Sequence, residues 1–179
     1  AGRSSESPRA APRCCCVPRG RRAAPTRHRR SAGEASSTSW RAPTICRPRP
    51  VGPGVGGPRV VQASALRPDR VGAAVACHPG NGLVTNNPDS PHLLAPKIKA
   101  KNYFAIAQND EASWKMQHPD QPDIVARLKT AYADADNPCG SEVFAANHGW
   151  CLNDSAAYNK AEAERAWTQM LATFKEGVV

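Results

Sequence analysis

The first 50 residues contain no Leu, Phe or Tyr, and this absence decides which part of the 179-residue chain can fold. Twelve Arg and two acidic residues give this segment a net charge of +10, whereas the remainder, with twelve basic and thirteen acidic residues, stands at −1. A segment without these apolar side chains cannot bury enough surface to offset the loss of chain entropy on folding. We therefore expect residues 1–50 to be disordered and residues 51–179 to form the folded domain.

The sequence leaves three interpretations of residues 1–50 open. Abundant Arg, Pro, Ala, Ser and Gly without Lys is typical of GC-rich DNA translated in a wrong reading frame, and we favour this non-native origin. A disordered linker is the second interpretation. The third is an arm that contacts an acidic partner such as nucleic acid through its phosphates. We do not favour nucleic acid, because Trp40 is the only aromatic residue among the arginines.

Neither a membrane anchor nor a metal centre is indicated by the sequence. No window approaches the ~18 consecutive apolar residues of a transmembrane helix, and no apolar core of a secretory signal is present. The seven cysteines include no C-x-x-C pair. His148 and Cys151 are three residues apart but lack the second ligand pair of a zinc site. We expect a cytoplasmic protein with reduced thiols and no bound metal.

Runs of apolar residues beyond Val51 predict strands. Residues 71–77 form a continuous run of small apolar residues, which is typical of a parallel strand buried on both faces. Residues 103–107 and 142–146 are runs of similar length. The sequence thus predicts about three strands, roughly half of an ordinary α/β domain.

Amphipathic segments between and after these runs predict helices. Apolar residues recur at helical spacing over residues 121–135 and 161–175, and Pro58 suits the first turn of a short helix over residues 58–66. Residues 111–120 are predicted to form a loop. The long Gly-, Asn- and Pro-rich stretch 78–96 is of the kind that shapes binding sites. Alternating strands and helices predict an α/β fold with a parallel sheet.

An acid and a histidine each follow a predicted strand. Asp110 comes just after residues 103–107, and His148 comes just after residues 142–146. In a parallel sheet, sites form at the carboxyl ends of the strands. The order acid, helix, histidine is that of the second half of a nucleophile–acid–histidine hydrolase. A lone Asp or His after a strand is more often a turn or capping residue, but the ordered pair favours catalysis.

Residues 51–179 resemble the carboxyl-terminal half of the dienelactone hydrolase family, a branch of the α/β-hydrolase fold. Three segments carry the resemblance: Pro68-Asp69-Arg70-Val71 with the strand ending in His78, Pro88 to Leu94, and His148-Gly149-Trp150 with the helix after it. The resemblance implies a hydrolase of small esters or lactones, like carboxymethylenebutenolidase, without a cofactor. It also implies that Asp110 and His148 belong to a catalytic triad.

The same resemblance implies a Cys or Ser nucleophile on a G-x-C-x-G turn. Counting back from Pro68, this turn falls on residues 52–56, which places Gly54 at the nucleophile position and Val55 in the oxyanion region. Glycine has no side chain to attack a carbonyl. In addition, the prolines of residues 47–50 exclude a central strand before the turn. We therefore expect impaired activity, and the alternative is a non-enzymatic remnant or binding module that uses the Arg-rich arm.

Other side chains are weaker candidates for the missing nucleophile. Cys77 is more simply a buried thiol, Cys151 lies outside the turn, and Ser64 falls on the following helix.

His78 is expected to order the loop after its strand. Exposed loop positions are expected for His92 and His118, and packing of the last helix is expected for Trp150 and Trp167. The resemblance also implies an Arg shortly after the histidine that helps to hold a substrate carboxylate. Residues 151–154 contain no Arg, which favours another ester or lactone over a dienelactone.

Overall fold

The computed structural model describes residues 47–177. The predicted disorder of residues 1–50 falls almost entirely outside these described residues, and the domain boundary stays a prediction. Within the described part, no helix is long and apolar enough to cross a membrane. The cytoplasmic location likewise stays a prediction.

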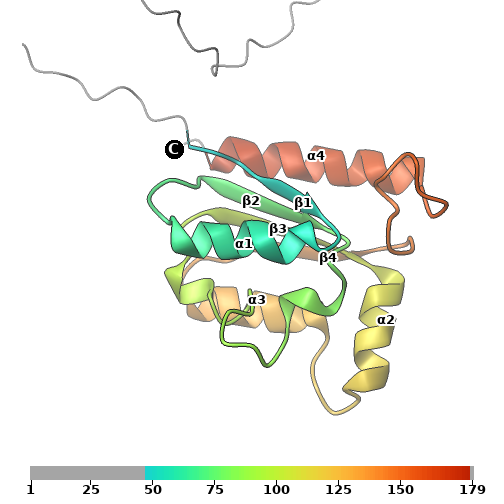
Figure 1. The fold of residues 1–179 in the computed structure, drawn as a ribbon, viewed down its shortest axis with the longest axis horizontal. Helices are drawn as coiled ribbons and strands as arrows, with labels where there is room; N and C mark the ends of the chain where they lie inside the picture. The colour runs from blue at the N-terminus through green and yellow to red at the C-terminus, as the bar shows by residue number, and fades with distance from the viewer. Residues whose placement is uncertain (1–46, 178–179) are drawn as a thin grey trace, which may run out of the picture. The chain divides into compact units, whose positions relative to one another are not determined.

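Four parallel strands and four α-helices make up residues 47–177 (Figure 1). The strands are β1 (Val51–Pro53), β2 (Ala73–Cys77), β3 (Lys101–Ala107) and β4 (Gly140–Phe144). The α-helices are α1 (Gly56–Leu66), α2 (Gln108–Gln117), α3 (Ile124–Asp134) and α4 (Lys160–Glu176), and two short 3₁₀ helices are η1 (Gly80–Leu83) and η2 (Ala95–Lys97). The predicted α/β class is confirmed.

The sheet has the order β1-β2-β3-β4, and every neighbouring pair is parallel. It has one more strand than the three that the sequence predicts. The extra strand, β1, has only three residues, one of them Pro53, so its apolar pattern is too short to recognise. Pro48 and Pro50 precede it and accept hydrogen bonds from Gly72 N (3.1 Å) and Val75 N (3.1 Å) through their carbonyls. These prolines are tolerated because β1 is the edge strand of the described sheet.

Helix α2 corrects the prediction of a loop over residues 111–120. The polar run Gln108-Asn109-Asp110-Glu111 opens this helix, so no apolar stripe marks it in the sequence. The buried Trp114 fixes it to the domain, and its indole Nε1 donates to Pro122 O (3.1 Å). Asp110 consequently lies in the first turn of a helix and not in a polar turn after the strand.

Strand β4 begins and ends two residues before the predicted run 142–146. Ala145 and Ala146 leave the ladder, because Ala146 N turns back to Phe144 O (2.7 Å). The carbonyl of Ala146 accepts instead from Gln108 N (3.1 Å), at the start of α2. This hydrogen bond joins the segment after β4 to the start of α2. It thereby brings the residues after β4 close to the first turn of α2.

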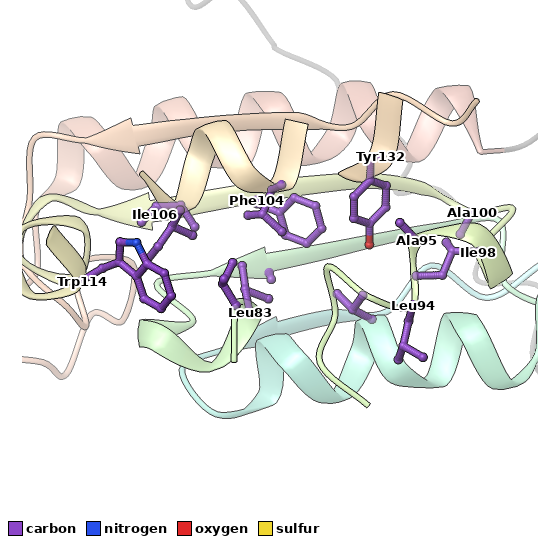
Figure 2. Packing of buried hydrophobic residues seen from close by; sticks show 14 of the residues in the cluster. Leu83, Leu94, Ala95, Ile98, Ala100, Phe104, Ile106, Trp114 and Tyr132 are labelled. Carbon is purple, nitrogen blue, oxygen red and sulfur yellow. The ribbon is translucent and has the colours of Figure 1, made fainter. Parts of the chain in front are cut away.

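Apolar side chains on the two faces of the sheet form two separate clusters. Helices α1 and α3 cover one face and α4 covers the other (Figure 1). Phe104, Leu83, Trp114 and Tyr132 lie in the first cluster, which Figure 2 shows. The second cluster contains these residues: Val75, Cys77, Tyr103, Ala105, Ala107, Phe144, Ala146, Trp150, Ala166 and Met170. Residues of β2 and β3 alternate between the clusters, as the two-residue period of a strand requires.

Candidate active site

Asp110 and His148 come together at the carboxyl edge of the sheet. Asp110 follows β3 and His148 follows β4, and neighbouring parallel strands end on the same side. The imidazole Nδ1 lies 2.9 Å from Asp110 Oδ2 and 3.1 Å from Oδ1. The carboxylate side chain is 11% exposed and the imidazole 44%. With its proton on Nδ1, His148 donates to the carboxylate, which leaves Nε2 free to accept a proton.

Two further hydrogen bonds hold this pair in place. Gly80 N donates to Asp110 Oδ2 (3.2 Å), and Asn109 Oδ1 accepts from His148 N (2.8 Å). Sequence reasoning missed both supporting residues. Asn109 directly precedes Asp110 and so shares its place at the strand end, which is a usable signal. Gly80 gives no such signal, since its contact depends on how the loop after β2 folds.

Gly54 lies opposite the free nitrogen of His148. It follows β1, donates from its backbone N to Cys77 O (3.0 Å) and has φ +50°, a left-handed conformation that glycine adopts without steric cost. A Cβ atom added at Gly54 would lie 3.8 Å from His148 Nε2. The structure therefore brings Gly54, His148 and Asp110 together, with an empty position where a side chain would face the imidazole.

A cleft of about 520 Å³ lies beside His148. Val55, at the amino-terminal end of α1, is 89% exposed and forms part of its wall. Most of the other lining residues come from α1 and from the long loop after β2: Pro58, Arg59, Gln62, Pro79, Gly80, Asn81, Gly82, Thr85, Asn87, Asp89, Ser90 and Pro91. The loop within residues 78–96 thus borders the site. Sequence reasoning missed Arg59 and Gln62, whose only signal is their place on the helix after the glycine-rich turn.

Ser64, Cys77 and Cys151 do not take the place of a nucleophile in this cleft. Ser64 is buried on α1, and its hydroxyl donates to Val60 O (2.8 Å). Cys77 and Cys151 line a different cavity, next to α4. None of the three faces His148 Nε2 in the way that position 54 does. The buried position predicted for Cys77 is present, with 7% of the residue exposed.

Three predictions about single side chains are wrong. His92 is not an exposed loop residue: it is 8% exposed, its Nδ1 lies 3.0 Å from Ser90 Oγ, and burial together with the charge of Arg127 lowers its pKa. His118 is half-buried against Trp114, with ring centroids 3.9 Å apart. Trp167 is 57% exposed and does not pack α4 onto the sheet.

His78 and Trp150 lie behind the candidate site. Trp150 is fully buried, as predicted for a packing residue, and stacks on Phe144 with ring centroids 4.6 Å apart. His78 is 2% exposed, and its ring contacts those of His148 (4.7 Å) and Trp150 (6.1 Å) edge to face. Its backbone N donates to Ala105 O (2.8 Å), which ties the start of the loop to β3.

The four-stranded parallel sheet and the Asp–His pair at its carboxyl edge define a hydrolase-like α/β domain. The model of the dienelactone hydrolase family matches residues 50–178, and the chain belongs to this family. No curated protein matches the chain.

Solved structures share the fold. One of them is a protein from Klebsiella pneumoniae subsp. pneumoniae, provisionally described as a dienelactone hydrolase. The TM-score is 0.55 at 21% sequence identity, over 72% of this chain and 51% of that chain. The chain described here thus spans about half the length of that protein.

Proposed function

We propose that the chain carries the acid and histidine of a hydrolase that cleaves esters or lactones, and that Gly54 leaves it without the nucleophile. One observation carries this proposal: a side chain at position 54 would face His148 Nε2, whose Nδ1 is already bonded to Asp110. Membership of the dienelactone hydrolase family supports the reaction class.

A nucleophile at position 54 would complete a three-part mechanism. It would lose its proton to His148 Nε2 as it attacks the substrate carbonyl, and Asp110 would hold the imidazole and stabilise its charged form. Backbone N–H groups near Val55, at the amino-terminal end of α1, would stabilise the oxyanion. The imidazole would then return the proton to the leaving group, and water would release the acyl group.

With Gly54 in place, the chain has no group to form the covalent intermediate. His148 can still accept a proton from water, but a water molecule is not held and oriented as a bonded side chain is. Oxyanion stabilisation alone leaves only a small residual rate. We therefore infer that the chain as it stands is an inactive or very slow hydrolase.

The cleft supports a small molecule as the substrate. Its volume of about 520 Å³ falls within the range of small-ligand sites. Arg59 is the only Arg or Lys among its lining residues, and its Nη1 donates to Gln62 Oε1 (3.2 Å). Because the described residues that line the cleft supply little positive charge, we propose neutral esters or lactones over substrates with several carboxylates.

Substitution at Gly54 tests the proposal. We expect Gly54→Cys to hydrolyse p-nitrophenyl acetate about 10²–10⁴-fold faster than the wild-type chain, the range that a positioned proton acceptor contributes. Gly54→Ala is the matched control, since it adds the same Cβ and the same backbone strain of about 1–2 kcal/mol but no nucleophile. Acetylation of the introduced thiol, measured by mass spectrometry, identifies the covalent step.

Two outcomes would contradict the proposal. Rapid hydrolysis by the wild-type chain that His148→Ala abolishes would show that Gly54 does not disable it. A folded Gly54→Cys variant with no more activity and no more acetylation at position 54 than expected for an isolated thiol would show that His148 does not activate this position. Circular dichroism of both variants establishes that they are folded.

A further inference from the structure

A second cavity, of about 460 Å³, lies on the α4 face of the sheet. Its walls come from β1, the end of β2, the segment after His148 and α4, and most of them are apolar. The lining residues are Val51, Pro53, Cys77, Cys151, Leu152, Asn153, Tyr158, Ala163, Glu164, Ala166, Trp167 and Met170. Glu164 is the only Asp, Glu, Lys, Arg or His among the described residues that line it, so the cavity suits an uncharged ligand.

Two thiols meet in the wall of this cavity. Cys77 is the last residue of β2, and Cys151 packs against the same apolar cluster from the segment after β4. Both thiols are free, and both side chains line the same cavity. Cys77 is buried and Cys151 is half-buried, so Cys151 is the thiol that a ligand in the cavity reaches first.

His78 directly follows Cys77, and its ring has no hydrogen-bond partner among the described residues. The residue is 2% exposed, and no oxygen or nitrogen atom of the described residues bonds to either of its ring nitrogens. A buried polar group without a partner is costly. The imidazole of His78 is nevertheless close enough to Cys151 to lower the pKa of that thiol.

These neighbours make the two thiols chemically different. The interaction with Cys77 is the largest cause that lowers the pKa of Cys151 to about 5; burial opposes it, and His78 adds to it. The interaction with Cys151, together with burial, raises the pKa of Cys77 above its ordinary value. A half-buried thiolate in the same cavity wall as a buried thiol is an arrangement in which one sulfur attacks and the other resolves.

We propose that Cys151 and Cys77 form a thiol–disulfide exchange site that accepts small uncharged disulfides in the cavity beside α4. This activity does not depend on Gly54, Asp110 or the cleft beside His148, and so it goes beyond the proposed hydrolase function.

The proposed reaction takes place in two steps. The Cys151 thiolate attacks one sulfur of the disulfide RS–SR, which breaks the S–S bond, forms Cys151–S–SR and releases RS⁻. Cys77 then loses its proton, attacks the Cys151 sulfur and releases a second RS⁻ as the Cys77–Cys151 disulfide forms. The two released thiolates can take up the protons of the protein thiols, and two electrons pass from the protein to the small disulfide.

The first test measures how fast each thiol reacts in the wild-type chain of 179 residues. Iodoacetamide labelling between pH 5 and 9, resolved by peptide mass spectrometry, gives a rate for every cysteine. The ionisable groups that line the cavity or adjoin Cys151 are Cys77, His78, Tyr158 and Glu164. Cys139 is the matched control, because it is also half-buried, and burial raises its pKa to about 12.

We expect the rate at Cys151 to level off above about pH 6 and the rate at Cys139 to keep rising with pH. At pH 6, Cys151 should react at least about a hundredfold faster, since its larger thiolate fraction outweighs its lower intrinsic nucleophilicity. A Cys151 rate that rises through pH 8–9 like that of an ordinary thiol would overturn the proposal. This comparison needs no variant that has to fold.

The second test follows the products of reaction with hydroxyethyl disulfide. In the wild-type chain we expect a linked pair of peptides containing Cys77 and Cys151, and in Cys77→Ser we expect the mixed disulfide to accumulate on Cys151. Cys151→Ser should leave Cys77 unmodified. A stable mixed disulfide on Cys151 of the wild-type chain, with no bond to Cys77, would overturn the resolving role. Equal modification of Cys139 would overturn the site as a whole.

Discussion

Two histidines whose rings touch serve two incomplete sites. His148 has a carboxylate, Asp110, but faces the empty position at Gly54. His78 lowers the pKa of the Cys151 thiol, but its ring has no hydrogen-bond partner among the described residues. Each of the two proposed sites lacks one group, but the loss matters more for acyl transfer than for disulfide exchange. Acyl transfer needs nucleophile, base and acid together, whereas disulfide exchange needs only a stabilised thiolate.

Among the variants that distinguish the two proposed sites, Asp110→Asn made in the Gly54→Cys chain is expected to change activity the most. The amide cannot hold the tautomer that leaves Nε2 free, and the analogous change in a complete triad lowers kcat about 10⁴-fold. Ester hydrolysis should fall accordingly, while the pH profile of Cys151 alkylation should stay unchanged. If both activities fell together, the two sites would have to be treated as one.

Trp150→Ala should weaken both sites, through the stability of the domain. Trp150 is fully buried between Phe144 and His78, and removing such a side chain costs about 3–5 kcal/mol of unfolding free energy. Trp167→Ala is the matched control, because that side chain is 57% exposed and a surface change stays within about 0.5 kcal/mol. Urea denaturation measures both, and equal losses would contradict the packing described here.

A smaller effect is expected from His92, which supports the loop on the cleft side only. Burial and the charge of Arg127 lower its pKa in the folded chain, so the unfolded chain binds a proton more readily. The stability that His92 contributes is therefore present above its ordinary pKa of about 6.5 and is lost as the pH falls below it.

Urea unfolding at pH 7.5 and 5.5 tests this sign. The wild-type chain should lose more stability on acidification than His92→Gln, whose side chain does not gain a charge. The difference between the two chains isolates His92 from the other titrating groups. An identical loss in both would show that His92 is protonated equally in the folded and unfolded states.

The parts of the fold that the sequence predicts correctly depend on contiguous residues. Strands β2 and β3 are continuous apolar runs, and α3 and α4 carry apolar residues at helical spacing. Strand β1 is too short and helix α2 too polar for such signals. Their positions are set by tertiary contacts, namely the ladder with β2 and the burial of Trp114.

The candidate sites divide in the same way. The places of Asp110 and His148 follow from the ends of two strands, and counting along the chain locates Gly54. The supporting bonds of Gly80 and Asn109 depend on how a loop and a helix end meet, which no local pattern encodes. The neighbourhood of His78, Cys77 and Cys151 likewise needs the fold, because β3, α2, α3 and β4 separate Cys151 from the other two residues.

The prolines before β1 have a consequence for motion. Pro48 and Pro50 accept hydrogen bonds from the β2 side but have no N–H to return. The seam between β1 and β2 pairs three residues, whereas the other two seams of the described sheet pair five each. Local opening starts where backbone pairing is sparse. Because Gly54 directly follows β1, each opening of this seam would carry position 54 away from His148. A nucleophile introduced at position 54 would reach His148 only while β1 is paired with β2. The rate of ester hydrolysis would then depend on how often this edge strand opens.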